Sequence, residues 1–330
     1  MYFQDTKLTY RFYQTNLNYS DLQFQMMRVM GAVPNADRRV PADVQTLGDE
    51  VRDGLTYRKI SFATEPGDRC PAWLILPKAA ATAEPTRHPA MLCLHQTTKI
   101  GKDEPAGLGG KANLHYAREL AERGYVVFVP DYPGYGEYHI DPYAMGYDST
   151  TMKGIWNHLR AMDVICDLPM VDPDRVGCIG HSLGGHNALF LATFDERVRV
   201  AVSSGGFTLF TWNDDERRGE RGDLSDWSHK GYMPWIRERF NCRVEDFPFD
   251  WDEVLESICP RAVFINAPED DFMRVEGVRE CMEKVQPTFD AAGASIACVH
   301  PPCEHDFPPD VRAQAYAFVD RCLGHVPMND

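Results

Sequence analysis

The segment from Val176 to Thr193 constrains the fold of this chain more than any other part of its sequence. An apolar run at 176–179 leads into Gly-His-Ser-Leu-Gly at 180–184, and a helix-like segment follows. Strand, tight turn and helix therefore come in succession, with Ser182 at the tip of the turn. The flanking glycines allow a backbone that is too cramped for side chains, so the serine hydroxyl stands clear of its neighbours.

This turn has two interpretations. The amides just after Ser182 open a helix, and their dipoles favour a developing negative charge nearby. That is what a serine needs in order to attack a carbonyl group. The alternative is a glycine-rich strand-to-helix turn that holds a bystander serine. The strand–helix context favours the nucleophile.

Apolar strand-like segments alternate with helix-like segments over most of the chain. The expected strands are 90–94, 125–130, the strand leading into Ser182, 198–203, 262–267 and 294–300, and the expected helices are 112–123, 151–168, 275–291 and 311–323. This alternation predicts an α/β fold whose mostly parallel sheet is covered by helices on both faces. Ahead of it, apolar runs at 56–63 and 72–76 flank a turn and predict an antiparallel hairpin.

Two segments fall outside this alternation. Residues 1–50 are expected to form a polar, mostly helical extension ahead of one large domain at 51–330. The segment 207–251 lacks a clear strand and is rich in aromatic residues, which predicts a small cap over the carboxyl edge of the sheet. Most of its aromatic side chains are expected to pack the cap on the body. The candidates for a substrate pocket among them are Phe207, Trp212 and Trp227.

A serine hydroxyl needs a base within hydrogen-bond reach, and that base needs an acid to orient it. In open α/β sheets such groups come from loops at the carboxyl ends of strands. His305 follows the last expected strand and is the predicted base. Among the other histidines, His181 flanks the serine and should point its side chain away, and His300 at the strand end is expected to be structural.

The predicted acid is Asp270, in the loop after the expected strand 262–267. Glu269 and Asp271 compete with it, but Asp270 lies three residues past the small residue that closes the strand, and this offset favours it. The competing interpretation is that these acids cap the following helix. The order serine, acid, histidine is that of α/β-hydrolases and differs from the orders in chymotrypsin-like and subtilisin-like enzymes.

Two backbone amides are predicted to hold the negative oxygen of a tetrahedral intermediate. One belongs to Leu183, directly after the serine, and the other to Thr97, in the loop after the first central strand. His95 in that loop is expected to brace it rather than to take part in the chemistry. The tyrosines of the loop 131–138 either shape the mouth of the site or pack the loop, and Tyr135 is a further pocket candidate.

Over about residues 55–325 the chain resembles α/β-hydrolases, in particular the dienelactone hydrolase and acetyl-xylan-esterase-like branches. The resemblance rests on the serine turn, on Asp-Tyr-Pro-Gly-Tyr-Gly at 131–136, on the Asp270 loop and on Glu-His-Asp-Phe-Pro at 304–308. It implies an α/β-hydrolase fold and hydrolysis of carboxylic esters, such as short acyl or sugar-type esters, without a metal or an organic cofactor.

Two residues of this chain differ from the pattern of that family, and both differences narrow the range of expected functions. Dienelactone hydrolases use a cysteine nucleophile, whereas residue 182 is serine, which favours a serine esterase. Many relatives carry His-Gly in the oxyanion loop, whereas this chain has Gln96 after His95, so Gln96 is a pocket candidate that narrows the site or contributes a donor. The alternatives are a peptidase or amidase, a thioesterase, a lactonase, or a binding protein of this fold without turnover.

Composition excludes several partners. The net charge of −15 without a basic stripe makes nucleic acid and anionic membranes unsuitable, so the expected partner is a small-molecule ester, with a homo-oligomer left open. The polar start from Met1 to Tyr13 lacks the apolar core of a secretory signal. None of the ten cysteines forms a Cys-x-x-Cys pair, and such scattered thiols are typical of a reducing compartment. A cytoplasmic protein is therefore expected.

Overall fold

The computed structural model of the protein describes residues 19–78, 87–213 and 221–327, so the polar start at 1–13 lies outside the described residues. These residues build a nine-stranded sheet in the order β1-β2-β3-β5-β4-β6-β7-β8-β9. The strands are β1 (Gln45–Arg52), β2 (Leu55–Glu65), β3 (Asp68–Leu76), β4 (His88–Leu94), β5 (Val126–Pro130), β6 (Val171–His181), β7 (Val200–Ser204), β8 (Ala262–Asn266) and β9 (Ile296–Val299).

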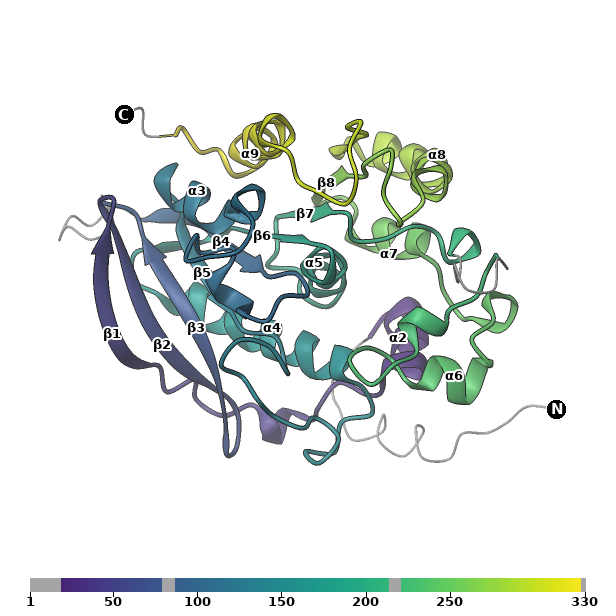
Figure 1. Cartoon of the computed structure of the whole chain (residues 1–330), viewed down its shortest axis with the longest axis horizontal. Coiled ribbons are helices and arrows are strands. Elements are labelled where there is room, and N and C mark those ends of the chain that lie inside the picture. The colour runs from purple at the N-terminus through teal and green to yellow at the C-terminus, as the bar shows by residue number, and fades with distance from the viewer. Residues whose placement is uncertain (1–18, 79–86, 214–220, 328–330) are drawn as a thin grey trace.

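The antiparallel and parallel parts of the sheet meet at β5. Strands β1, β2 and β3 pair in antiparallel fashion, as do β3 and β5, and the first three form the twisted ribbon at the left of Figure 1. From β5 onward the strands pair in parallel, so β4, β6, β7 and β8 bring their carboxyl ends to one edge. The predicted mostly parallel sheet is confirmed, and the predicted hairpin is part of a three-stranded ribbon.

Helices cover both faces of the parallel part. The helices of the described residues are α2 (Asp21–Met30), α3 (Tyr116–Glu122), α4 (Thr150–Asp167), α5 (Leu183–Phe194), α6 (Trp235–Phe240), α7 (Trp251–Ile258), α8 (Val275–Ala292) and α9 (Pro309–Leu323). Helices α3 and α9 share one apolar cluster with the sheet, and α4, α5, α7 and α8 share the other. Helix α5 is mostly apolar and is buried on nearly all sides, because the sheet, α4 and α7 enclose it.

The predicted extension at 1–50 needs correction. Its described part is helical at α2, where Met26, Met27, Val29 and Met30 are buried, and has otherwise only a short 3-10 turn at Ala36–Arg38. Residues 45–50 belong to β1, so the boundary expected at residue 51 falls inside a strand. The pattern missed β1 because this edge strand is exposed on both faces and lacks apolar alternation.

The segment between β7 and β8 holds short helices rather than strands. Its described residues form 3-10 turns at Phe210–Trp212, Ser225–Trp227 and Val244–Asp246, and α6 packs against α2 at the lower right of Figure 1. Phe210, Trp227 and Trp251 pack on one another with ring centroids 5.7 to 5.9 Å apart. Most aromatic side chains of this segment therefore hold it on the body, as expected.

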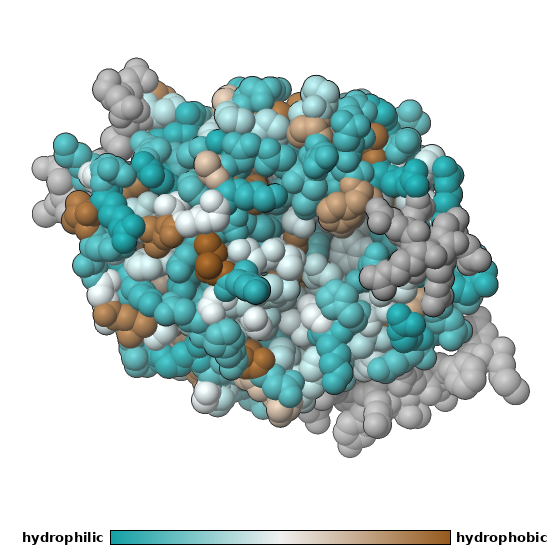
Figure 2. Space-filling view, in the orientation of Figure 1, coloured by the Kyte–Doolittle hydropathy of each residue, from teal (hydrophilic) through white to brown (hydrophobic). Residues whose placement is uncertain are grey.

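The surface is mostly hydrophilic on the face drawn in Figure 2, where hydrophobic residues are scattered singly and form no broad patch. Scattered exposed apolar side chains of this kind are normal for a globular protein and mark no interface by themselves. Within the described ranges, the helices are too short or too polar to cross a membrane.

A buried ion cluster fastens the turn between β2 and β3 to α4. The fully buried Lys153 places its Nζ atom 2.6 Å from a carboxylate oxygen of Glu65 and 2.7 Å from one of Asp68. Thr64 and Tyr138 also donate hydrogen bonds to Asp68. Burial alone would raise the pKa of Asp68, but the ammonium group of Lys153 and these hydrogen bonds outweigh it and lower that pKa.

Replacement of this lysine tests the cluster. Lys153→Met is expected to lower the free energy of unfolding by about 3–5 kcal/mol near pH 7, because Asp68 stays buried without a cation and Glu65 keeps only its ion pair with Arg38. Since the folded-state pKa of Asp68 lies below its unfolded value, its stabilising contribution is present above about pH 4 and is lost as the pH falls through the folded-state pKa. Urea unfolding of both proteins at neutral and acid pH measures the two effects.

The matched control for this experiment is Arg52→Met, which removes a half-exposed ion pair with Glu50 and should change stability by about 1 kcal/mol at most. If Lys153→Met proves as mild as this control at pH 7, the cluster does not stabilise the fold. If the difference in unfolding free energy between the wild type and Lys153→Met is the same at acid pH as at neutral pH, the charges assigned to the carboxylates are wrong.

Candidate active site

Ser182 occupies a strained turn between β6 and α5. Its φ and ψ angles of 53° and −117° lie outside the regions that residues with a side chain ordinarily adopt. A Cβ atom on Gly180 would lie 2.2 Å from the backbone of Gly184, and one on Gly184 would lie 1.9 Å from the carbonyl oxygen of Leu94. Only glycine fits at these two positions, and the resulting sharp turn places Ser182 at the carboxyl edge of the sheet.

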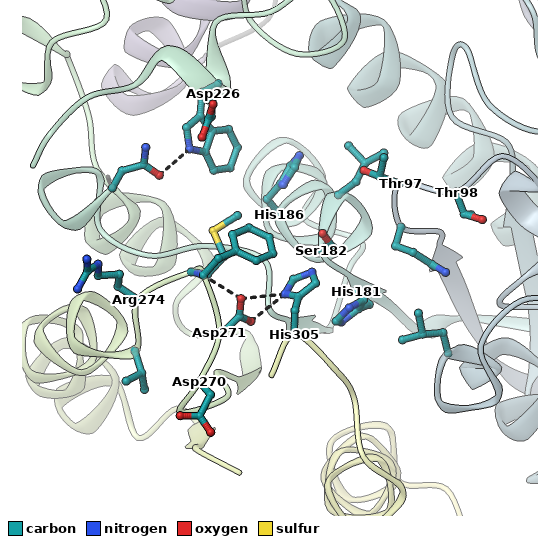
Figure 3. A pocket seen from close by; sticks show the side chains of 18 of the residues that line it. Thr97, Thr98, His181, Ser182, His186, Asp226, Asp270, Asp271, Arg274 and His305 are labelled. Atoms are coloured by element: carbon teal, nitrogen blue, oxygen red, sulfur yellow. Dashed lines mark hydrogen bonds and ion pairs between the residues drawn. The ribbon is translucent and has the colours of Figure 1, made fainter. Parts of the chain in front are cut away.

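The carboxylate that orients His305 comes from Asp271. The Nδ1 atom of His305 lies 2.9 and 2.8 Å from the two oxygens of Asp271, and Figure 3 draws both contacts. Asp271 is buried, whereas Asp270 is exposed and points away from the histidine. The prediction of Asp270 as the acid is therefore wrong, and its competitor Asp271 takes that position.

The turn after β8 explains this shift by one residue. The backbone amides of Glu269 and Asp270 donate to the carbonyl groups of Pro301 and Cys303, at 2.9 and 3.1 Å. These bonds fix the turn alongside the loop that carries His305, and the Asp270 side chain lines the same cavity but points away from the histidine. An offset counted along the sequence contains no information on these two contacts.

His181 lies against the imidazole of His305, with ring centroids 4.5 Å apart. The expectation that its side chain points away is wrong, because His181 lines the same cavity as Ser182. Its Nδ1 atom lies 2.9 Å from the Ser204 hydroxyl oxygen. Burial, together with repulsion from His305, lowers the pKa of His181 well below its ordinary value. A neutral His181 does not compete with His305 for a proton near pH 7.

His95 braces the loop after β4, as predicted. Its Nε2 atom accepts a hydrogen bond from the amide of Tyr132 at 2.8 Å, so Nδ1 carries the ring proton and donates to the Gln96 carbonyl group at 2.6 Å. Burial lowers the pKa of His95 and favours this neutral form. The ring therefore links the loops that follow β4 and β5.

A cavity of about 1140 Å³ opens over Ser182. Leu183 and Thr97, the predicted amide donors, line it, and so do the predicted pocket residues Gln96 and Trp227. Leu183 is the first residue of α5, and the amide of such a residue has no acceptor inside its own helix. The sequence prediction therefore placed these four residues correctly at one cavity.

Three other predicted pocket residues lie outside the lining of this cavity. Phe207 is buried against Trp251, with ring centroids 5.1 Å apart. Trp212 donates its ring N–H to Glu280 at 2.7 Å, and Tyr135 packs on the loop after β4. Aromatic content marked the right segments, but it does not distinguish side chains that pack a segment from those that face a cavity.

Sequence reasoning missed several lining residues, among them His186 and Phe272. His186 lies four residues after Ser182, hence on the same side of α5, and this spacing was the signal that could have found it. Burial lowers the pKa of His186 to about 3, so the ring is neutral near pH 7. Phe272 directly follows Asp271, is 60% exposed, and has its ring centroid 4.4 Å from that of His305.

Ser182 and His305 line the cavity together, and Figure 3 shows the serine hydroxyl beside the imidazole. Among the described residues, the Nε2 atom of His305 has no hydrogen-bond partner, so it is the ring nitrogen that remains for the serine hydroxyl. Hydrogen bonds of this kind are often long in the absence of substrate and tighten when it binds. The described part of the chain contains no cluster of three or more His, Cys, Asp or Glu side chains arranged to hold a metal ion.

Comparison of sequences relates this site to known proteins. Residues 141–293 match the family model described as glucuronyl esterase, fungi. The putative hydrolase YtaP of Bacillus subtilis is 30% identical over 195 residues, which are 54% of this chain and 61% of that protein. The 4-O-methyl-glucuronoyl methylesterase of Hypocrea jecorina is 24% identical over 206 residues, 58% of this chain and 44% of that protein. The chain therefore spans less than two thirds of either curated relative.

Solved structures extend the likeness over nearly the whole chain. A glucuronoyl esterase from Solibacter usitatus superposes with a TM-score of 0.68 at 17% identity, covering 90% of this chain and 89% of that one. Acetyl xylan esterase 1 from Thermoanaerobacterium sp. gives 0.58 at 18% identity, with 94% and 96% covered. The fold is that of the α/β-hydrolases. Within that fold the chain is similar to carbohydrate esterases, which confirms the acetyl-xylan-esterase part of the predicted resemblance.

The two neighbouring aspartates give a matched test of the acid. Asp271→Asn is expected to slow the labelling of Ser182 by a fluorophosphonate about 10⁴-fold, because an amide favours the wrong tautomer of His305. Asp270→Asn should be labelled at nearly the wild-type rate, since that side chain faces away from the histidine. The labelling is followed over time by mass spectrometry. Equal labelling rates for the two variants would exclude Asp271 as the acid that orients His305.

Proposed function

We propose that the protein is a serine esterase that hydrolyses carboxylic esters through an acyl-enzyme. As Ser182 attacks the ester carbonyl carbon, the Nε2 atom of His305 takes its proton, while Asp271 holds Nδ1 and stabilises the charged ring. His305 then gives the proton to the leaving alcohol. Water attacks the acyl-enzyme by the same route and releases the acid. The contact between His305 and Asp271 beside the strained Ser182 carries this proposal.

The negative oxygen of the tetrahedral intermediate would lie between the amides of Leu183 and Thr97. Both residues line the cavity at Ser182, and they come from the two loops that meet at Gly184. The positive end of the α5 dipole points to the same place, because Leu183 is the first residue of that helix. Donors fixed in advance in this way stabilise the transition state without reorganisation.

We further propose that the substrate is a carbohydrate ester whose acyl part is a uronic acid. The matches to the glucuronyl esterase family and to a 4-O-methyl-glucuronoyl methylesterase support this choice. Trp227 and Tyr232 in the cavity offer aromatic faces to a sugar ring, and His186 offers polar groups to its hydroxyls. An acetylated sugar is the second candidate, favoured by the likeness to an acetyl xylan esterase.

The proposed nucleophile has a direct test. Ser182→Ala is expected to lower the rate of p-nitrophenyl acetate hydrolysis by about 10⁶-fold, because members of a triad act as a unit. Ser225→Ala, in a 3-10 turn outside the cavity lining, is the control and should hydrolyse the ester like the wild type. Release of p-nitrophenol by Ser182→Ala at a rate near wild type would exclude this serine as the nucleophile.

The proposed substrate class is tested by comparing kcat/KM for four compounds. These are a methyl ester of glucuronic acid, an acetylated xylose derivative, p-nitrophenyl acetate and a peptide p-nitroanilide. The highest value is expected for the glucuronate ester. A higher kcat/KM for the acetylated sugar would mean that the carbohydrate is the alcohol part of the substrate and not its acyl part. Fast cleavage of the anilide together with slow ester hydrolysis would indicate a peptidase and contradict the esterase proposal.

A further inference from the structure

Gln96 has a buried side chain without a partner. It is 6% exposed, and among the described residues neither its Oε1 nor its Nε2 atom has a hydrogen bond. The same side chain lines the cavity that contains Ser182. A buried donor or acceptor left unpaired costs about 1–3 kcal/mol, so such a group in a cavity calls for a ligand that satisfies it.

The backbone around Gln96 is fixed against the serine turn. Its carbonyl group accepts a hydrogen bond from the Nδ1–H group of His95. The Nε2 atom of His95 accepts a hydrogen bond from the backbone amide of Tyr132. Two residues before Gln96, the carbonyl oxygen of Leu94 lies so close to Gly184 that a Cβ atom on Gly184 would be 1.9 Å away. The loop therefore touches the first turn of α5 immediately before Gln96. The backbone that carries Gln96 is therefore held against the start of α5, and the Gln96 side chain lines the same cavity as Leu183.

We propose that the Gln96 carboxamide donates a hydrogen bond to the oxyanion, as a third donor beside the amides of Leu183 and Thr97. This inference rests on the esterase function proposed above. The oxygen of an ester carbonyl is only an acceptor, and it becomes a stronger one as the reaction proceeds. Of the two unpaired ends of Gln96, the Nε2 group is the one that can bind it.

Gln96 assists the formation and collapse of the tetrahedral intermediate. The Ser182 oxygen forms a bond to the carbonyl carbon, the π electron pair moves onto the carbonyl oxygen, and the serine proton moves to the Nε2 atom of His305. When the intermediate collapses, the carbonyl bond re-forms and the bond to the leaving oxygen breaks, and that oxygen takes the proton from His305. Gln96 donates to the oxygen only while it carries the charge, and its own proton is not transferred.

The test removes the proposed hydrogen-bond donor of Gln96 and keeps a side chain of similar volume. Gln96→Met should lower the rate of fluorophosphonate labelling of Ser182 by about 10²–10³-fold, because the phosphonyl oxygen occupies the position of the oxyanion. For the best ester, kcat should fall by the same factor with KM nearly unchanged, since the bond is made in the transition state. The unfolding midpoint should not fall, because an unpaired buried amide has been replaced by an apolar group of similar size.

Gln96→Glu and Lys99→Ala complete the experiment. Glutamate keeps the shape but offers no amide donor and places an acid beside the oxyanion, so its loss should be at least as large as that of methionine. Lys99 is exposed on the same loop outside the cavity lining, and its alanine variant should label like the wild type.

The outcomes separate this inference from the function on which it rests. Labelling of Gln96→Met at the wild-type rate, a loss confined to KM, or a lowered unfolding midpoint would each overturn the role of Gln96 while Ser182 remains reactive. A wild-type protein whose Ser182 is not labelled at all would overturn the esterase function and this inference together. A loss in kcat and in labelling rate, with the midpoint maintained, supports the assignment.

Discussion

The close approach of two backbones at Gly184 determines the geometry of the whole site. With no side chain at Gly184, the carbonyl oxygen of Leu94 can touch the start of α5, and this contact fixes the loop after β4 against the serine turn. Backbone hydrogen bonds extend the arrangement across the sheet edge: the Ser182 amide donates to the Ser204 carbonyl group at 2.7 Å, and the Gly205 amide to that of Asn266 at 2.8 Å. The ends of β6, β7 and β8 are thereby held in register. Ser182 and Asp271, which are 89 residues apart in sequence, line one cavity together with His305 because of this registration.

Polar clusters keep the surrounding loops in place. The buried Asp131 accepts the backbone amides of Lys102 and Glu137 and contacts the Lys102 ammonium group at 3.0 Å. The motif at 131–136, on which part of the family resemblance rests, thus ties the loop after β5 to the segment after β4. Asn266 does the same on the other side, since it donates to the Ser204 hydroxyl group and to the Asp306 carbonyl group next to His305. These hydrogen bonds hold the loops that carry the site against the ends of the strands.

Periodicity and turn chemistry predicted the parallel sheet, the strand–turn–helix at Ser182 and the position of His305, because each depends on local sequence and on strand order. The exposed strand β1 escaped prediction because it has no buried face to impose an apolar pattern. The acid was assigned one residue too early, because the choice between Asp270 and Asp271 depends on backbone bonds to a loop more than 30 residues away. Which aromatic side chains face the cavity was equally out of reach, since Phe207 and Trp227 differ only in their tertiary neighbours.

The surroundings of His305 restrict the motion of its ring. Its imidazole contacts the rings of His181 and Phe272, with centroids 4.5 and 4.4 Å away, while Asp271 holds Nδ1. A Cβ atom added at Gly205 would lie 2.8 Å from the His305 ring, so the backbone of Gly205 packs against another side of this ring. A half-turn about the Cβ–Cγ bond would have to displace all of these groups at once. In the proposed mechanism, protons therefore enter and leave the imidazole through Nε2 alone, while Nδ1 stays bound to Asp271.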